Sequence, residues 1–140
     1  MSRRRGRELA VQLLFQHDQS PLDAEVARRL FWSTRRASPE ACEFADSLYE
    51  AYLSRSEEVD AAIRNALSRW RLERLSAIDR SILRAAIAES WARQTPKAIV
   101  IDEAVEMAKK YGGEKSHEFV NAVLDRILKD SPVSENVEKT

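Results

Sequence analysis

Residues that begin helices recur along this chain, and they constrain its fold more than any other feature. A serine or threonine stands directly before a proline at Ser20-Pro21, Ser38-Pro39 and Thr95-Pro96, a pair that is typical of a helix N-terminus. Residues 54–57 and 76–79 each place a serine three positions before an acid, which is the spacing of a capping box. These starts, with a double glycine at 112–113 as a stop, predict seven helices near residues 3–18, 21–32, 39–53, 55–69, 77–93, 96–111 and 116–129.

The composition agrees with an all-α fold. Only three glycines and four prolines occur among 140 residues, and the frequent Ala, Leu, Arg and Glu residues favour helix. The least clearly marked stretch, residues 69–76, is predicted to be the seam between two lobes of one domain, about 1–70 and 71–130. Residues 131–140 are polar, and we expect a disordered tail there.

The sequence contains no motif of a common catalytic site. A phosphate-binding GxxxxGK[ST] loop, a GxGxxG turn, HExxH and GxSxG are all missing. The histidines His17 and His117 and the single cysteine Cys42 are too few for the usual zinc sites. We therefore expect no enzyme activity, no catalytic residue, no cofactor and no metal. No run of about 18 apolar residues is present, so we also expect no membrane contact and a cytoplasmic location.

Glu89 is an anomaly in the predicted helix 77–93. Ile78, Ile82 and Ala85 form its apolar stripe, and Glu89 takes the next position on that stripe. A carboxylate in a core must find hydrogen-bond donors or lose its charge. A catalytic acid and a structural role both fit this placement. The structural role, for instance accepting amide protons at the start of the following helix, is favoured because no partner for acid chemistry lies at a recognisable spacing.

Four arginines occur within the first seven residues, although the formal net charge of the chain is zero. In a helix that begins near Arg3, the side chains of Arg4 and Phe15 share one stripe, with Arg5 and Gln12 on its flank. Guanidinium groups bind phosphate and aromatic rings stack on bases, which suits single-stranded nucleic acid. A frayed basic terminus with Phe15 in the core explains the same residues equally well. Cations at a helix N-terminus oppose the helix dipole. A bound polyanion would offset that cost, and an unstructured arm before Gly6 would avoid it.

Three blocks of the sequence carry a family resemblance. They are RRRGRELAVQLLF, ERLSAIDRSILRAAIAE and KAIVIDEAVEMAKKYGGEKSHEFVNAVLDRIL. From Arg3 to about Leu128 the chain resembles the NusB family of bacterial transcription antitermination factors. This resemblance implies two small helical bundles packed together. It also implies binding of boxA, a short single-stranded RNA element of ribosomal RNA transcripts, together with ribosomal protein S10, which is also called NusE. With other Nus factors this complex loads onto RNA polymerase and suppresses premature termination.

The resemblance also implies roles for individual residues. The RNA-binding positions are Arg3, Arg4, Arg5, Arg7, Gln12, Phe15, Lys115, Ser116 and Phe119. The surface that faces S10 is expected to include Glu73, Asp79, Arg80 and Arg84. Two positions depart from the family pattern, because an acid is common at Lys115 and a tyrosine at Phe15. The alternative hypothesis is a homodimeric helical scaffold for protein interactions, in which the arginines serve only solubility or contact an acidic protein.

Overall fold

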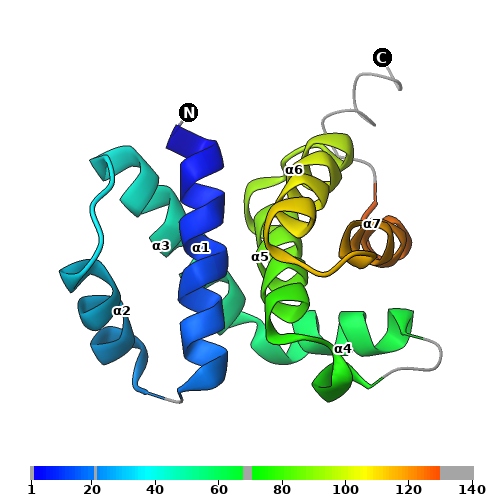
Figure 1. The fold of residues 1–140 in the computed structure, drawn as a ribbon, viewed down its shortest axis with the longest axis horizontal. Helices are drawn as coiled ribbons and strands as arrows, with labels where there is room; N and C mark the ends of the chain where they lie inside the picture. The colour runs from blue at the N-terminus through cyan, green and yellow to red at the C-terminus, as the bar shows by residue number, and fades with distance from the viewer. Residues whose placement is uncertain (1, 21, 68–70, 130–140) are drawn as a thin grey trace.

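The computed structural model describes residues 2–20, 22–67 and 71–129, and in these ranges it contains seven α-helices, one 3-10 helix and no strand. This confirms the predicted all-α fold (Figure 1). The predicted tail at 131–140 and the proposed lobe boundary near residue 70 lie outside the described residues. The elements in chain order are α1 Ser2–Gln19, α2 Ala24–Ser33, α3 Pro39–Ser54, α4 Ser56–Ala66, η1 Leu72–Arg74, α5 Ala77–Arg93, α6 Lys97–Tyr111 and α7 Ser116–Ile127.

Helix α5 lies at the centre of the molecule. It packs against α1 and α3 on one side and against α4, α6 and α7 on the other (Figure 1). Its residues 81–89 are all buried, because neighbouring helices surround it. The apolar side chains of both groups of helices join in one hydrophobic core. None of the described helices is long and apolar enough to cross a membrane.

Two of the predicted helix caps are confirmed. The hydroxyl of Ser38 accepts a hydrogen bond from the amide of Ala41 at 3.1 Å, and Pro39 is the first residue of α3. The hydroxyl of Ser76 accepts one from the amide of Asp79 at 3.1 Å. Each bond satisfies an amide that the first turn of a helix leaves unpaired.

Three other predicted starts were wrong. Thr95 does not cap α6, because the N-cap of that helix is Pro96, without a side-chain hydrogen bond, and its first residue is Lys97. Helix α2 does not begin at position 21, which lies outside the described residues, because Asp23 is its N-cap and accepts a hydrogen bond from the amide of Glu25 at 3.1 Å. The serine at position 54 does not cap α4. Its hydroxyl donates to the carbonyl of Ala51 at 3.0 Å, so Ser54 belongs to the last turn of α3.

Candidate nucleic-acid interface

The candidate interface lies on the open side of α1. This helix packs against α2, α3 and α5, and its buried residues are Gly6, Arg7, Leu9, Ala10, Val11, Leu13 and Leu14. The side chains of Arg3, Arg4 and Arg5 are exposed, and Gln12 is half-buried. Phe15 is 39% exposed, so it is not a core residue. The structure therefore brings Arg4, Arg5, Gln12 and an accessible aromatic ring onto one side of α1, whereas the exposed Arg3 lies toward Phe44 of α3.

Arg4 and Arg5 make ion pairs without being withdrawn from solvent. Nε and Nη2 of Arg4 donate to the two carboxylate oxygens of Glu103 on α6, at 3.1 and 2.9 Å. The Arg4 side chain is nevertheless 67% exposed. Nη1 of Arg5 donates to Glu8 on the same helix at 3.3 Å. The hydrogen bonds from Arg4 lower the pKa of Glu103, so the carboxylate that holds this arginine stays charged.

Glu8 joins α1 to the C-terminal end of α6. Its carboxylate accepts hydrogen bonds from Nζ of Lys110 at 2.8 Å and from the hydroxyl of Tyr111 at 3.2 Å. Burial alone would raise the pKa of Glu8, but the bonds from Lys110 and Arg5 lower it below its usual value. Arg4, Glu8, Glu103 and Lys110 line a groove of about 390 Å³ between the two helices. We call it the α1–α6 groove.

Arg7 differs from the other three arginines because it lies in the interior. Its Nε and Nη2 donate to the carboxylate of Glu89 at 2.8 and 2.7 Å, and the two side chains are 9% and 2% exposed. These hydrogen bonds raise the pKa of Arg7. The structural role predicted for Glu89 is confirmed, but its donor is Arg7 rather than the amides of the following helix. Arg7 precedes the buried Val11 and Leu14 by four and seven residues, and this helical phase is the sequence signal that distinguishes it.

Gly6 permits this buried pair to form. A Cβ atom at position 6 would lie 2.8 Å from a ring carbon of Phe44 and 3.1 Å from the carbonyl oxygen of Ala41. Only a glycine therefore lets α1 approach α3 this closely. The close approach brings the guanidinium of the next residue, Arg7, between the helices and toward Glu89 on α5.

The second predicted RNA-contacting segment is only partly accessible. Lys115 is exposed and directly precedes α7. Ser116 is buried, and its hydroxyl accepts a hydrogen bond from the amide of Gly113 at 2.8 Å and donates to Asp79 at 3.3 Å. Phe119 is half-buried and packs against the core. Ser116 thus fixes the turn between α6 and α7, and it joins that turn to the start of α5.

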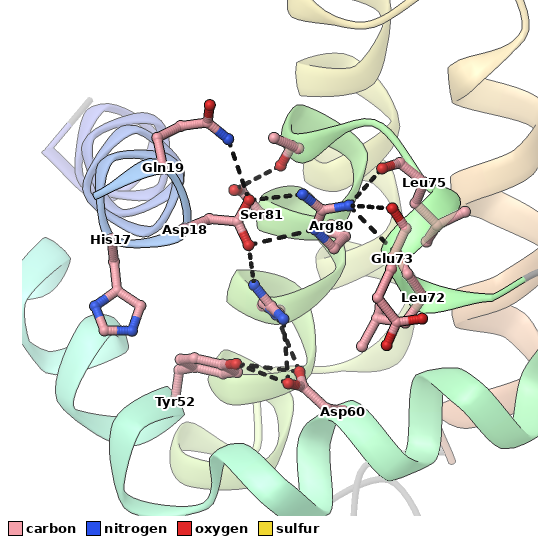
Figure 2. Close-up of polar contacts among 12 residues, drawn as sticks. His17, Asp18, Gln19, Tyr52, Asp60, Leu72, Glu73, Leu75, Arg80 and Ser81 are labelled. Atoms are coloured by element: carbon pink, nitrogen blue, oxygen red, sulfur yellow. Dashed lines mark hydrogen bonds and ion pairs between the residues drawn. The ribbon is translucent and has the colours of Figure 1, made fainter. Parts of the chain in front are cut away.

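Of the residues predicted to face S10, Glu73 lies in η1, Asp79 and Arg80 in the first turn of α5, and Arg84 near the middle of α5. Glu73 in η1 is exposed, whereas Asp79 and Arg80 are half-buried and Arg84 is buried. Figure 2 shows Arg80 directed at Asp18 of α1, with Nη2 2.6 Å from the carboxylate. The same guanidinium donates to the main-chain carbonyls of Leu72, Glu73 and Leu75.

Arg84 completes this charged network. Its Nη1 donates to Asp18 at 3.0 Å, and its Nε and Nη2 donate to Asp60 of α4 at 3.0 and 3.1 Å. The hydroxyl of Tyr52 on α3 also donates to Asp60, at 3.1 Å (Figure 2). Arg84 therefore connects α1, α4 and α5 and is held in the interior. Sequence reasoning missed Asp18, Asp60 and Tyr52, because their partners are far away in the chain and no local spacing indicates them.

Comparisons with known proteins agree with this architecture. The NusB family model matches residues 4–129. The transcription antitermination protein NusB of Koribacter versatilis is 40% identical over 131 residues, which cover 92% of this chain and 90% of that protein. The solved structure of T. maritima NusB is 33% identical, with a TM-score of 0.84 over 96% of both chains. A crystal structure of the antitermination factors NusB and NusE in complex with dsRNA contains a chain 28% identical, with a TM-score of 0.79 over 90% of this chain and 95% of that one.

Proposed function

Since this chain belongs to the NusB family of transcription antitermination factors, which are RNA-binding proteins and not enzymes, we propose that its RNA is the single-stranded boxA element of ribosomal RNA transcripts. It binds boxA together with ribosomal protein S10, also called NusE. In the cytoplasm this complex joins other Nus factors on RNA polymerase and suppresses premature termination. The observation that supports the proposal best is the open side of α1, where Arg4, Arg5 and Phe15 are exposed, with Arg3 exposed on the adjoining side toward α3.

The three exposed arginines bind the RNA backbone. A guanidinium has five N–H donors in a planar fork that fits phosphate oxygens. Arg4 uses two of its five donors for Glu103, and Arg5 uses one for Glu8. Both side chains therefore keep donors for a phosphate, although Glu103 and Glu8 compete with it for the two guanidinium groups.

Phe15 and Gln12 contact the bases. The exposed ring of Phe15 offers a face on which a base can stack. The amide of Gln12 is oriented by Arg35, whose Nε donates to the Gln12 side-chain oxygen at 3.2 Å. Lys115 adds charge from the turn before α7. Phe119, half-buried on α7, completes the second RNA-contacting segment. Arg7 and Ser116 stabilise the fold in this proposal and do not contact the RNA, because both are buried.

The S10 partner is supported by the relative that was crystallised with NusE. On this chain we place the S10 contact around η1 and the first turns of α5. Glu73 is the exposed member of the predicted set, and Arg80 fixes η1 through three main-chain carbonyls. Asp79 and Arg84 act from beneath this surface, where each is held by hydrogen bonds to other helices.

A binding titration tests the RNA proposal. Single-stranded boxA RNA, a scrambled RNA and duplex RNA of the boxA sequence are titrated with the protein, with and without S10. We expect the tightest binding for single-stranded boxA and a further gain with S10. If Arg3, Arg4 and Arg5 each contact one phosphate of a boxA RNA that carries flanking nucleotides, the logarithm of the affinity falls with the logarithm of the salt concentration with a slope near −2, at about −0.7 per contact.

Two charge-matched triple variants make the test specific. In the absence of S10, replacing Arg3, Arg4 and Arg5 by alanine is expected to abolish most of the salt-dependent affinity. Replacing Arg64, Arg71 and Arg74 by alanine removes the same charge at the other end of the molecule and is expected to change little. An unchanged boxA affinity of the first variant contradicts the proposal.

A further inference from the structure

A second groove lies on the other side of α1, where the first turns of α1 and α3 meet the last turn of α5. It has a volume of about 460 Å³, and its walls include Arg3, Phe44 and Arg93. Arg93 is the last residue of α5 and is exposed. We call this depression the α1–α5 groove. Neither the sequence patterns nor the family resemblance points to it.

Three guanidinium groups lie near the ring of Phe44, those of the buried Arg7 and of the exposed Arg3 and Arg93. The guanidinium carbon of Arg93 lies 4.7 Å from the ring centroid, and that of Arg3 lies 5.5 Å from it. The two carbons are therefore within about 10 Å of each other. Cation–π contact with the buried ring of Phe44 limits where both long side chains can go. A phosphate group between them can accept hydrogen bonds from both forks after small side-chain rotations.

These two arginines differ from the cations of the α1–α6 groove. There, Arg4 is paired with Glu103, Lys110 with Glu8 and Lys109 with Glu106. Among the described residues, no carboxylate forms an ion pair with Arg3 or Arg93. A phosphate that enters the α1–α5 groove thus has no internal ion pair to displace.

The surroundings favour an anion on the α1 side of the groove. The first amides of α1 have no partner within the helix, and the positive end of the helix dipole lies at this end. Glu40 and Glu43 of α3 also line the groove. Their charges oppose a polyanion beside them, so the favourable position for a phosphate is the one nearest to Arg3 and Arg93.

We propose that Arg3 and Arg93 together hold one backbone phosphate of an RNA strand that also occupies the open side of α1. The strand then passes the N-terminal end of α1 and reaches the last turn of α5. This site rests on the RNA-binding function proposed above and extends it. Nucleotides that flank boxA are therefore expected to add to the RNA affinity through this phosphate contact, whatever their bases are.

The test compares Arg93→Ala with Arg74→Ala on two RNAs. Arg74 is also exposed but precedes the N-terminal end of α5, whereas Arg93 lies at its C-terminal end. The short RNA contains boxA alone, and the long RNA adds flanking nucleotides at both ends. For the long RNA we expect Arg93→Ala to bind about fivefold more weakly at 0.1 M salt, with a salt slope shallower by about 0.7. Arg74→Ala binds both RNAs like the wild type, and Arg93→Ala binds the short RNA like the wild type.

The outcomes separate this inference from the proposed function. If the wild type does not prefer boxA to a scrambled RNA, the proposed function fails before any variant is compared. If the wild type does, but Arg93→Ala binds the long RNA normally, the phosphate site is wrong. The same loss in Arg74→Ala means general attraction by charge and also overturns it. A loss of S10 binding without loss of RNA binding assigns the groove to a protein and overturns it as well. Arg93→Lys, which keeps the charge, is expected to retain the slope.

Discussion

The buried pair of Arg7 and Glu89 allows a test of whether Arg7 stabilises the fold without contributing to RNA binding. Two single variants, Glu89→Leu and Arg7→Met, each leave one charged group without its main partner in the interior. The double variant replaces both groups by apolar side chains of similar size. Arginines at positions 3, 4 and 5 stay intact in all three proteins.

The expected free-energy changes follow from the surroundings of the pair. Removing one partner of a buried ion pair costs about 3–5 kcal/mol, whereas replacing both by apolar groups is close to neutral. Nη1 of Arg7 also lies 3.5 Å from Glu103, so Glu89→Leu leaves Arg7 a second carboxylate and is placed at the lower end of that range. Arg7→Met is placed at the upper end, because Glu89 is 2% exposed and Arg7 is its only hydrogen-bond partner in the described part of the chain.

Urea unfolding and RNA titration measure the two consequences. With a slope of about 2 kcal/mol/M, each single variant lowers the urea midpoint by roughly 2 M. The double variant recovers most of that loss, and its boxA affinity equals that of the wild type because Arg7 does not reach the RNA. A double variant as unstable as the single ones refutes the structural argument. A folded double variant with weakened boxA binding refutes the assignment of Arg7 to the interior.

The remaining predictions concern the surface and the charged network. Phe15→Ala is expected to weaken boxA binding by about 1–3 kcal/mol through lost stacking, and Phe15→Trp to retain it, in the same titration; equal affinities of all three proteins exclude a base on this ring. Glu103→Gln removes the charge that competes for Arg4, so it is expected to tighten RNA binding and steepen the salt slope; weaker binding shows instead that Glu103 is needed to orient Arg4. Burial and the nearby charge of Arg84 lower the pKa of His17 below its ordinary value of 6.5, so the unfolded chain binds this proton more readily than the folded one. Stability is therefore lost as the pH falls through that value, and the melting temperature is expected to drop between about pH 7.5 and 5.5. His17→Gln is expected to reduce this drop, and an unchanged drop assigns it to other groups.

Local features of the sequence predicted the helices well and the ion pairs poorly. Ser38 and Ser76 cap helices through bonds to residues three positions away, so the spacing alone is informative. The start at position 21 was wrong because Asp23, two residues later, makes the cap instead. Which of two neighbouring residues caps a helix depends on the path of the backbone before that helix. A short sequence pattern does not specify this path.

The site was predictable in its residue types but not in its partners. The misfit of Glu89 on an apolar stripe predicted that it needs donors, yet Arg7 is 82 residues away in the sequence. The family resemblance placed Arg84 on the surface that faces S10, whereas Asp18 and Asp60 from two other helices neutralise it inside. Such pairs depend on tertiary packing, because their members lie on different helices. A sequence pattern within one helix therefore does not predict them.

Glu103 touches an exposed arginine and a buried one at the same time. Its carboxylate accepts hydrogen bonds from Nε and Nη2 of Arg4 at the surface. The same carboxylate lies 3.5 Å from Nη1 of Arg7, whose other contacts are in the interior. A phosphate that draws Arg4 away leaves Glu103 to neutralise Arg7 alone. We therefore expect RNA bound at α1 to change amide hydrogen exchange in α6, residues 97–111, and that measurement tests whether the effect reaches this helix.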